Sequence, residues 1–139
     1  MNYKIIGKYI KDLKFEIPNL KTFFLLEKNI SNYKININIQ SHQFKDKIIE
    51  VITTLSLNPT TGEIDKIITK IDFSTIIQIE GELTEKESLE KIVLINVPNK
   101  VYPEIRSLFI LLFEKSGFSK IKINEKVDFK ELYLKRTIQ

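Results

Sequence analysis

Cysteine is absent from this sequence, histidine occurs once, and glycine and proline occur four times each. Without cysteine the chain has no disulfide framework, no thiolate metal site and no cysteine nucleophile. The single histidine, His42, cannot make the usual zinc site alone, and we interpret it as an exposed loop or strand-edge residue. Glycine-rich phosphate loops and the serine-hydrolase elbow are also missing as motifs. These absences argue against an enzyme, a metal site or a bound cofactor.

Long apolar runs are missing as well. The most apolar stretch, Ser107–Phe113, is far shorter than the roughly 20 residues that span a bilayer. Charged side chains interrupt the N-terminal residues Met1–Ile17, which therefore lack the apolar region of a secretory signal. We expect a soluble, cytoplasmic protein without direct membrane insertion.

Arginine is scarce although the formal net charge is +4. Only Arg106 and Arg136 are arginines, the residue type that clamps phosphate and reads base edges. The lysines alternate with acids, as in Lys45-Asp46-Lys47 and Glu85-Lys86-Glu87, and do not form one basic stripe. This pattern favours a solvated surface and no nucleic-acid partner. A basic nucleic-acid-binding domain stays an alternative that the charge alone motivates.

The chain length of 139 residues suits one domain, so we expect a single domain over residues 1–139. The first half shows the period-two alternation of strands, and the second half shows helix signals, an order that predicts a segregated α+β fold. The expected strands are Tyr3–Ile17, Tyr33–Ile39, Ile48–Leu57 and Ile64–Ile79. In the first strand, Tyr9, Leu13 and Phe15 are expected to share the apolar face. The turn residues Asn58–Gly62 predict a hairpin between the last two strands.

Three helix starts are indicated in the second half. Thr84–Glu87 and Asp128–Glu131 each have the residues of a capping box. Between them, Pro103 suits a first helical turn and Gly117 suits a left-handed helix end. The helix that they bound is apolar nearly all round and must therefore be buried on more than one side. We interpret the second side as a contact with another subunit.

Three segments share their order and spacing with one known family. Tyr9–Asn19 is similar to the family's opening strand with its Phe-Glu-x-Pro ending. Val97–Arg106 is similar to the start of the family's long helix, where a proline is followed by an aromatic-proline pair and then by an arginine. Gly117-Phe118, followed by Val127–Tyr133, is similar to its closing segment. Together these segments cover nearly the whole chain, which in this respect resembles the SecB family of protein-export chaperones.

The resemblance implies an antiparallel four-stranded sheet with helices packed on one face, assembled as a homotetramer from two dimers. It also implies an ATP-independent chaperone that binds unfolded secretory preproteins and hands them to the SecA translocation ATPase. Asp12, Glu16 and Ile68 fall at family positions that dock this ATPase, and Tyr133 and Phe129 fall at positions of the client groove. The residues alone fit equally well with two ordinary exposed acids and, for Tyr133, with an ordinary core aromatic, which is the favoured interpretation of Phe129.

The chain also departs from the family pattern. Lys70 stands where a docking acid is expected, and Ser74-Thr75 replaces a pair of small glycines. Members are usually acidic with an acid-rich tail, whereas this chain is basic and closes on Arg136–Gln139. These departures motivate a second alternative, a SecB-like chaperone dedicated to a single partner such as an antitoxin.

Overall fold

The computed structural model describes residues 2–29, 33–59, 67–82, 85–118 and 123–138. Its core is a four-stranded antiparallel sheet in the order β1-β4-β3-β2, so β1 and β2 form the two edges. The strand bounds are β1 Asn2–Glu16, β2 Tyr33–Lys45, β3 Ile48–Pro59 and β4 Ile68–Glu80. The helical elements are α1 Leu20–Asn29, α2 Lys86–Lys91, the π-helical turn η2 Ile92–Asn96, α3 Val97–Lys115 and α4 Phe129–Ile138. The expected strands and their antiparallel sheet are therefore confirmed.

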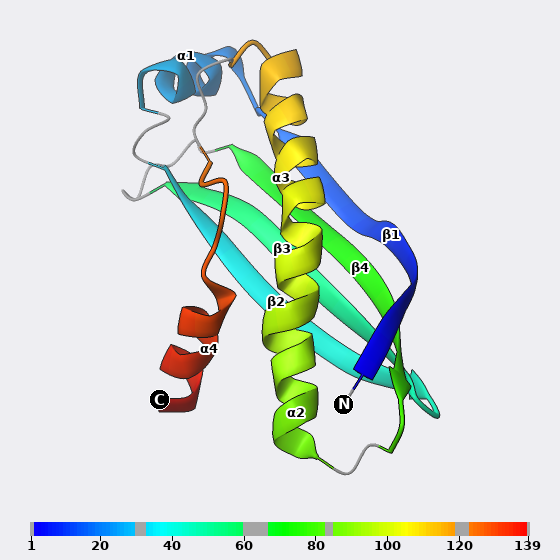
Figure 1. Ribbon diagram of the computed structural model, residues 1–139. Coiled ribbons are helices and arrows are strands. Elements are labelled where there is room, and N and C mark those ends of the chain that lie inside the picture. Colours follow the sequence, from blue (N-terminus) through cyan, green and yellow to red (C-terminus); the bar gives the residue numbers. More distant parts are fainter. Residues whose placement is uncertain (1, 30–32, 60–66, 83–84, 119–122, 139) are drawn as a thin grey trace.

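A long helical run crosses one face of the sheet (Figure 1). It consists of α2, η2 and α3 in succession, and α4 lies beside it over the β2 edge (Figure 1). On the side of α3, Phe109 and Phe113 are fully buried against Leu55 and Ile71 of the sheet. Phe15 adds an edge-to-face contact with Phe113 at a centroid distance of 5.1 Å. We call this side of the sheet the helix face and the opposite side the outer face.

The expectation that the first half holds only strands is wrong, because α1 lies between β1 and β2. Asn19 caps this helix, since its side-chain oxygen accepts a hydrogen bond from the Thr22 amide at 2.8 Å. Leu26 anchors α1 in the core with no exposed surface. The predicted turn at Asn58–Gly62 and the predicted start of the last strand fall largely outside the described residues, and β4 is described from Ile68.

Strand β1 carries two register shifts, between Ile5 and Gly7 and between Ile10 and Asp12. Each shift inserts a residue and so inverts the alternation of faces beyond it. As a result Tyr9 stands opposite Ser74 and donates a hydrogen bond to a carboxylate on the outer face. The prediction that Tyr9 shares a face with Phe15 is therefore wrong.

The long helix begins earlier than Pro103, which lies inside α3 instead of in a first turn. Pro98 occupies the start of α3, and η2 directly precedes it. Because Pro98 has no N–H to donate to the carbonyl of Leu94, the π-helical turn stands where a regular hydrogen bond is lost. At the other end of the run, Glu85 precedes α2, and the predicted cap Thr84 lies outside the described residues.

Helix α3 ends as its sequence predicts. Gly117 has a φ of 92°, the left-handed conformation that glycine adopts without strain. Its amide donates to the Glu114 carbonyl at 3.1 Å, and the Phe118 amide donates to the Phe113 carbonyl at 2.9 Å. This pair of bonds is the Schellman motif, which satisfies carbonyls that the helix end leaves open.

Candidate functional site

Helix α4 stands over the β2 edge because two contacts fix its start. The Asp128 side chain accepts a hydrogen bond from the Glu131 amide at 3.0 Å, so the predicted cap is confirmed. Phe129, the first helical residue, is buried against Tyr102 of α3 at a centroid distance of 6.0 Å. The carboxylate of Glu131 pairs with Lys135 at 3.4 Å and does not turn back to the cap. The helix is thus held beside β2, with space left between them.

Three hollows follow one another along the helix face of β2. Their volumes are about 370, 190 and 610 Å³. Ile37 and Leu132 line the first two, and Ile39 and Leu94 line the last two, so the hollows form one line. We call this line the β2 trough. The residues that line it on the helix side are Tyr102, Leu132, Tyr133, Leu94, Val93, Glu90, Leu89 and Lys86.

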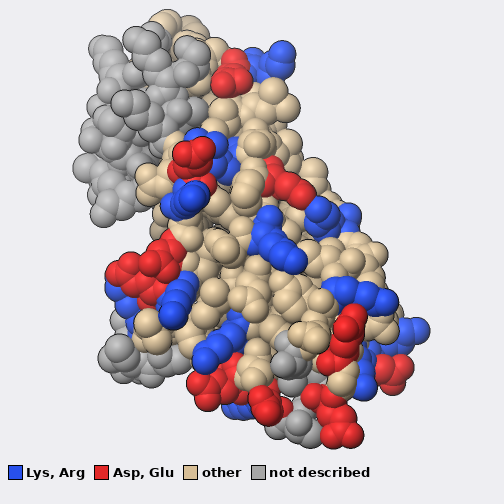
Figure 2. Space-filling view, viewed as in Figure 1, with Lys and Arg blue, Asp and Glu red and all other residues tan. Residues whose placement is uncertain are grey.

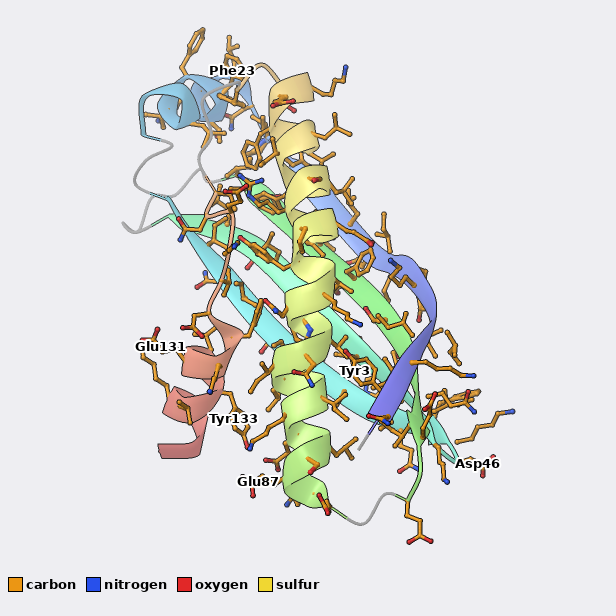
Figure 3. The ribbon with its side chains drawn as sticks, in the orientation of Figure 1. Tyr3, Phe23, Asp46, Glu87, Glu131 and Tyr133 are labelled. Atoms are coloured by element: carbon orange, nitrogen blue, oxygen red, sulfur yellow. The ribbon has the colours of Figure 1, made fainter. Side chains whose placement is uncertain are left out.

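Tyr133, a predicted groove residue, lines the middle of the β2 trough. It points from α4 toward the long helix (Figure 3), where its hydroxyl donates to the Glu90 carboxylate at 3.4 Å. Desolvation, together with the charges of Glu90 and Glu87, raises the pKa of the Tyr133 phenol, which therefore stays a neutral donor. The second predicted groove residue, Phe129, is 2% exposed and belongs to the core under α4.

Leu132 is the trough residue that sequence reasoning missed. It is 44% exposed and lines two of the three hollows. A signal was available in the sequence, since Leu132 directly precedes the predicted groove residue Tyr133 in the same helix. Leu94 was missed for a different reason, because the π-helical turn that holds it does not follow the 3.6-residue spacing.

The three candidate docking residues meet at one end of the outer face. Glu16 and Ile68 are direct cross-strand partners, and Asp12 stands further along β1 opposite Asp72. Between them, Lys14 faces Lys70 across the strands. This arrangement brings the predicted set together and places the reversed charge of Lys70 in its centre.

Nearer the other end of the outer face, several side chains surround the carboxylate of Glu50, a group that we call the Glu50 cluster. Glu50 accepts hydrogen bonds from Ser74 at 2.6 Å, from Lys11 at 3.1 Å and from Tyr9, and His42 contacts it at 3.0 Å. The hydrogen bonds from Ser74 and Tyr9 lower the pKa of Glu50 from 4.5 to about 2. The donors come from all three other strands, so the ionised carboxylate of Glu50 ties the sheet together. His42 lies on the edge strand β2, as expected.

Other types of site find little support in the described part of the chain. Its His, Asp and Glu residues do not gather in groups of three that could hold a metal ion. Within the same residues, no helix combines the length and apolar character of a membrane span. Figure 2 shows lysine and acid side chains interspersed over the side that carries α3, without a continuous basic stripe.

Comparison with known proteins extends over the whole chain. The sequence model of the family described as preprotein translocase subunit SecB matches residues 1–139. A SecB relative from Pelagibacter ubique (strain HTCC1062) is 40% identical over 135 residues, which cover 97% of this chain and 96% of the relative. The protein-export protein SecB of Anaplasma phagocytophilum (strain HZ) is 27% identical over 145 residues, covering 96% and 91% of the two chains.

The fold has a counterpart among solved structures. A SecB-like chaperone of Mycobacterium tuberculosis, determined with a peptide of the HigA1 antitoxin, superposes with a TM-score of 0.67. The match covers 90% of this chain and 88% of that one at 11% identity, and it shows a shared fold. With the family match over its full length and a relative at 40% identity, this chain belongs to the SecB family of protein-export chaperones.

Proposed function

We propose that this protein is an ATP-independent holdase that binds unfolded preproteins in the cytoplasm and hands them to the SecA translocation ATPase. Its family gives it a chaperone role in protein export. The observation that carries the proposal is the β2 trough, a channel of mixed aliphatic, aromatic and polar lining that runs beside an edge strand. No catalytic step is needed for this activity.

The trough suits an extended and variable client. Its aliphatic lining, such as Ile37 and Leu132, fits many side chains because it has no shaped pocket for one of them. In the described sheet β2 pairs with β3 alone, so its other backbone edge is open to an extended peptide. Binding of the unfolded chain and not of its folded form draws the client toward the unfolded state by mass action.

We also propose that residues 1–139 act as one domain that assembles as a dimer of dimers. Helix α3 supports this assembly, because one of its sides keeps apolar surface that the protomer does not cover. Leu111 is 46% exposed, and Leu108, Ile110 and Leu112 are only partly buried. The open edge of β1 is a second surface on which another copy could pair.

Asp12, Glu16 and Ile68 are the proposed contact with SecA, supported by their shared position on the outer face. The pairing of Lys14 with Lys70 inside this group favours a second candidate, a chaperone that serves one partner such as an antitoxin. Electrostatic complementarity sets partner choice and association rate, so a changed charge pattern suits a changed partner. A pull-down that recovers many preproteins supports export, and one dominant protein supports the second candidate.

The holdase activity can be tested by light scattering without nucleotide. A urea-unfolded preprotein is diluted into buffer with the wild-type protein, with Leu132→Ser or with Leu20→Ser. Leu20 is a matched control, since it is 71% exposed on α1 and lies outside the trough. We expect wild type and Leu20→Ser to suppress aggregation and Leu132→Ser to require several-fold more protein. Equal activity of the two variants would remove the trough from the proposal.

A further inference from the structure

The outer face carries another hollow, which adjoins one end of the β2 trough because His42 and Gln43 of the β2 edge strand line both. We call it the outer-face pocket. It has a volume of about 510 Å³ and is lined by Ile6, Tyr9, His42, Gln43, Phe44, Ile48, Glu50 and Ile76. This volume lies in the range of ligand and side-chain pockets, roughly 300–1,000 Å³. None of the predicted site residues lines it.

Two β-bulges build the walls of the outer-face pocket. Ile6 is the extra residue of the first shift in β1, and Phe44 is the extra residue of the shift between Gln43 and Lys45 in β2. Ile6 is 47% exposed, Tyr9 is 43% exposed and Phe44 is 73% exposed. Large apolar side chains with this much exposure, grouped around one hollow, mark a surface that binds a partner.

The acid inside the pocket does not oppose a negative partner. Glu50 already receives hydrogen bonds from Ser74, Tyr9 and Lys11 and a contact from His42. The ion pair with Lys11 balances its charge locally. The sign of the surrounding potential is therefore set by the rim and not by Glu50.

Lysines outnumber acids around the pocket, where Lys4, Lys45 and Lys47 stand against Asp46 and Glu80. One row of cross-strand partners runs through the pocket residue Ile48 and consists, from β1 to β2, of Lys4, Gln78, Ile48 and Lys45. A lysine therefore stands at each edge of the sheet in this row. Lys45 also lies over the Phe44 ring at 5.7 Å from its centroid. Of the carboxylates that the structure describes, none pairs with Lys4, Lys45 or Lys47. Asp46, at the tip of the β2–β3 hairpin (Figure 3), is the acid between the last two lysines.

We propose that the outer-face pocket docks an acidic segment of a partner protein through one aliphatic or aromatic anchor residue. The anchor fills the space between Ile6, Tyr9 and Phe44, and flanking carboxylates meet Lys4, Lys45 and Lys47. The apolar walls supply most of the affinity, and the lysines select against basic segments. This docking uses the opposite face of the sheet from client holding in the β2 trough, although His42 and Gln43 line both hollows, and it is separate from the contact at Asp12, Glu16 and Ile68.

Fluorescence anisotropy with two labelled peptides tests the proposal. One peptide has the sequence Asp-Glu-Leu-Phe-Glu-Asp, and the other has the same apolar centre between lysines. We expect the acidic peptide to bind more tightly and to lose affinity as salt rises. Phe44→Ser should weaken its binding about tenfold, or about 1.4 kcal/mol, because the anchor loses an aromatic wall of the pocket. Lys45→Glu should weaken the acidic peptide and strengthen the basic one.

The controls separate this pocket from the other surfaces. Leu20→Ser and Lys21→Glu repeat the two substitutions at exposed positions of α1, and both should bind as wild type does. Leu132→Ser in the β2 trough should also bind normally, although it is expected to lose holdase activity. Equal affinity for the two peptides, unchanged binding by Phe44→Ser, or a loss with Leu132→Ser would overturn the proposal. Self-association that Phe44→Ser abolishes would overturn it too, since the occupant would then be a second copy.

Discussion

The two ends of the outer face use the same strands but hold their charges in different ways. At one end Asp12 and Lys14 form an ion pair of 3.9 Å between side chains that are 44% and 60% exposed. At the other end the side chain of Glu50 is 16% exposed and has donors on three sides. Exposed pairs are screened by water and contribute little, whereas a shielded carboxylate with several donors is held firmly. We therefore expect charge substitutions at the Asp12 end to leave the stability of the fold nearly unchanged, whereas substitution of Glu50 should lower it.

Among the substitutions that test this difference between the two ends, removal of the Glu50 carboxylate should change the stability of the protein most. In Glu50→Ala the buried hydroxyl of Ser74, which has no exposed surface, loses its acceptor. We expect a loss of about 1–3 kcal/mol in the free energy of unfolding, measured by urea denaturation. Asp12→Ala is the matched control at the other end and should change it by less than about 0.5 kcal/mol. Similar losses in the two variants would mean that shielding does not distinguish the ends.

The same carboxylate should make the free energy of unfolding depend on pH, with a loss of stability in acid. Folding lowers the pKa of Glu50 from 4.5 to about 2, so the folded state binds this proton less readily than the unfolded chain. The stabilisation is therefore complete above pH 4.5 and is lost as the pH falls from 4.5 toward 2. Urea midpoints of wild type and Glu50→Gln should differ by a constant amount above pH 4.5 and converge below it. A difference that grows on acidification would contradict the assignment.

Sequence pattern was sufficient for the sheet but not for the two ends of its outer face. Alternation in β3 and β4 predicts which residues are buried, because those strands are regular. In β1 the inserted residues Ile6 and Lys11 invert the alternation, and period-two reasoning has no means to locate them. Helix α1 was missed although Asn19 offered a recognisable N-cap, because the helix is only 10 residues long and interrupts a run of strands.

Of the candidate sites, too, one was predicted from the sequence and the other was not. The predicted docking residues Asp12, Glu16 and Ile68 came from a family resemblance, and the strand register places them on one face of the sheet. The Glu50 cluster was not foreseen, since its partners lie 24 to 41 positions away in sequence for Ser74 and Tyr9. Such a cluster becomes visible only when the strand order is known.

The smallest effect on stability should come from Lys70→Glu, which restores the acid that the family pattern expects. Lys70 pairs with Asp72 at 3.6 Å and loses this contact, but the new carboxylate stands opposite Lys14. Since Lys70 is exposed, these changes nearly cancel, and we expect the free energy of unfolding to move by less than about 0.5 kcal/mol. A larger effect should appear in binding, because charge at an exposed rim acts chiefly on the association rate.

Stopped-flow association with SecA separates the two candidate functions at this position. If Asp12, Glu16 and Ile68 form the SecA contact, Lys70→Glu should associate several-fold faster at low salt, and high salt should remove the gain. Lys130→Glu repeats the charge reversal on the exposed side of α4 and serves as the control for net charge alone. A rate that both variants raise equally would reflect the overall charge of the protein. A rate that Lys70→Glu lowers would show that Lys70 itself meets an acid on the partner, which favours a dedicated partner over export through SecA.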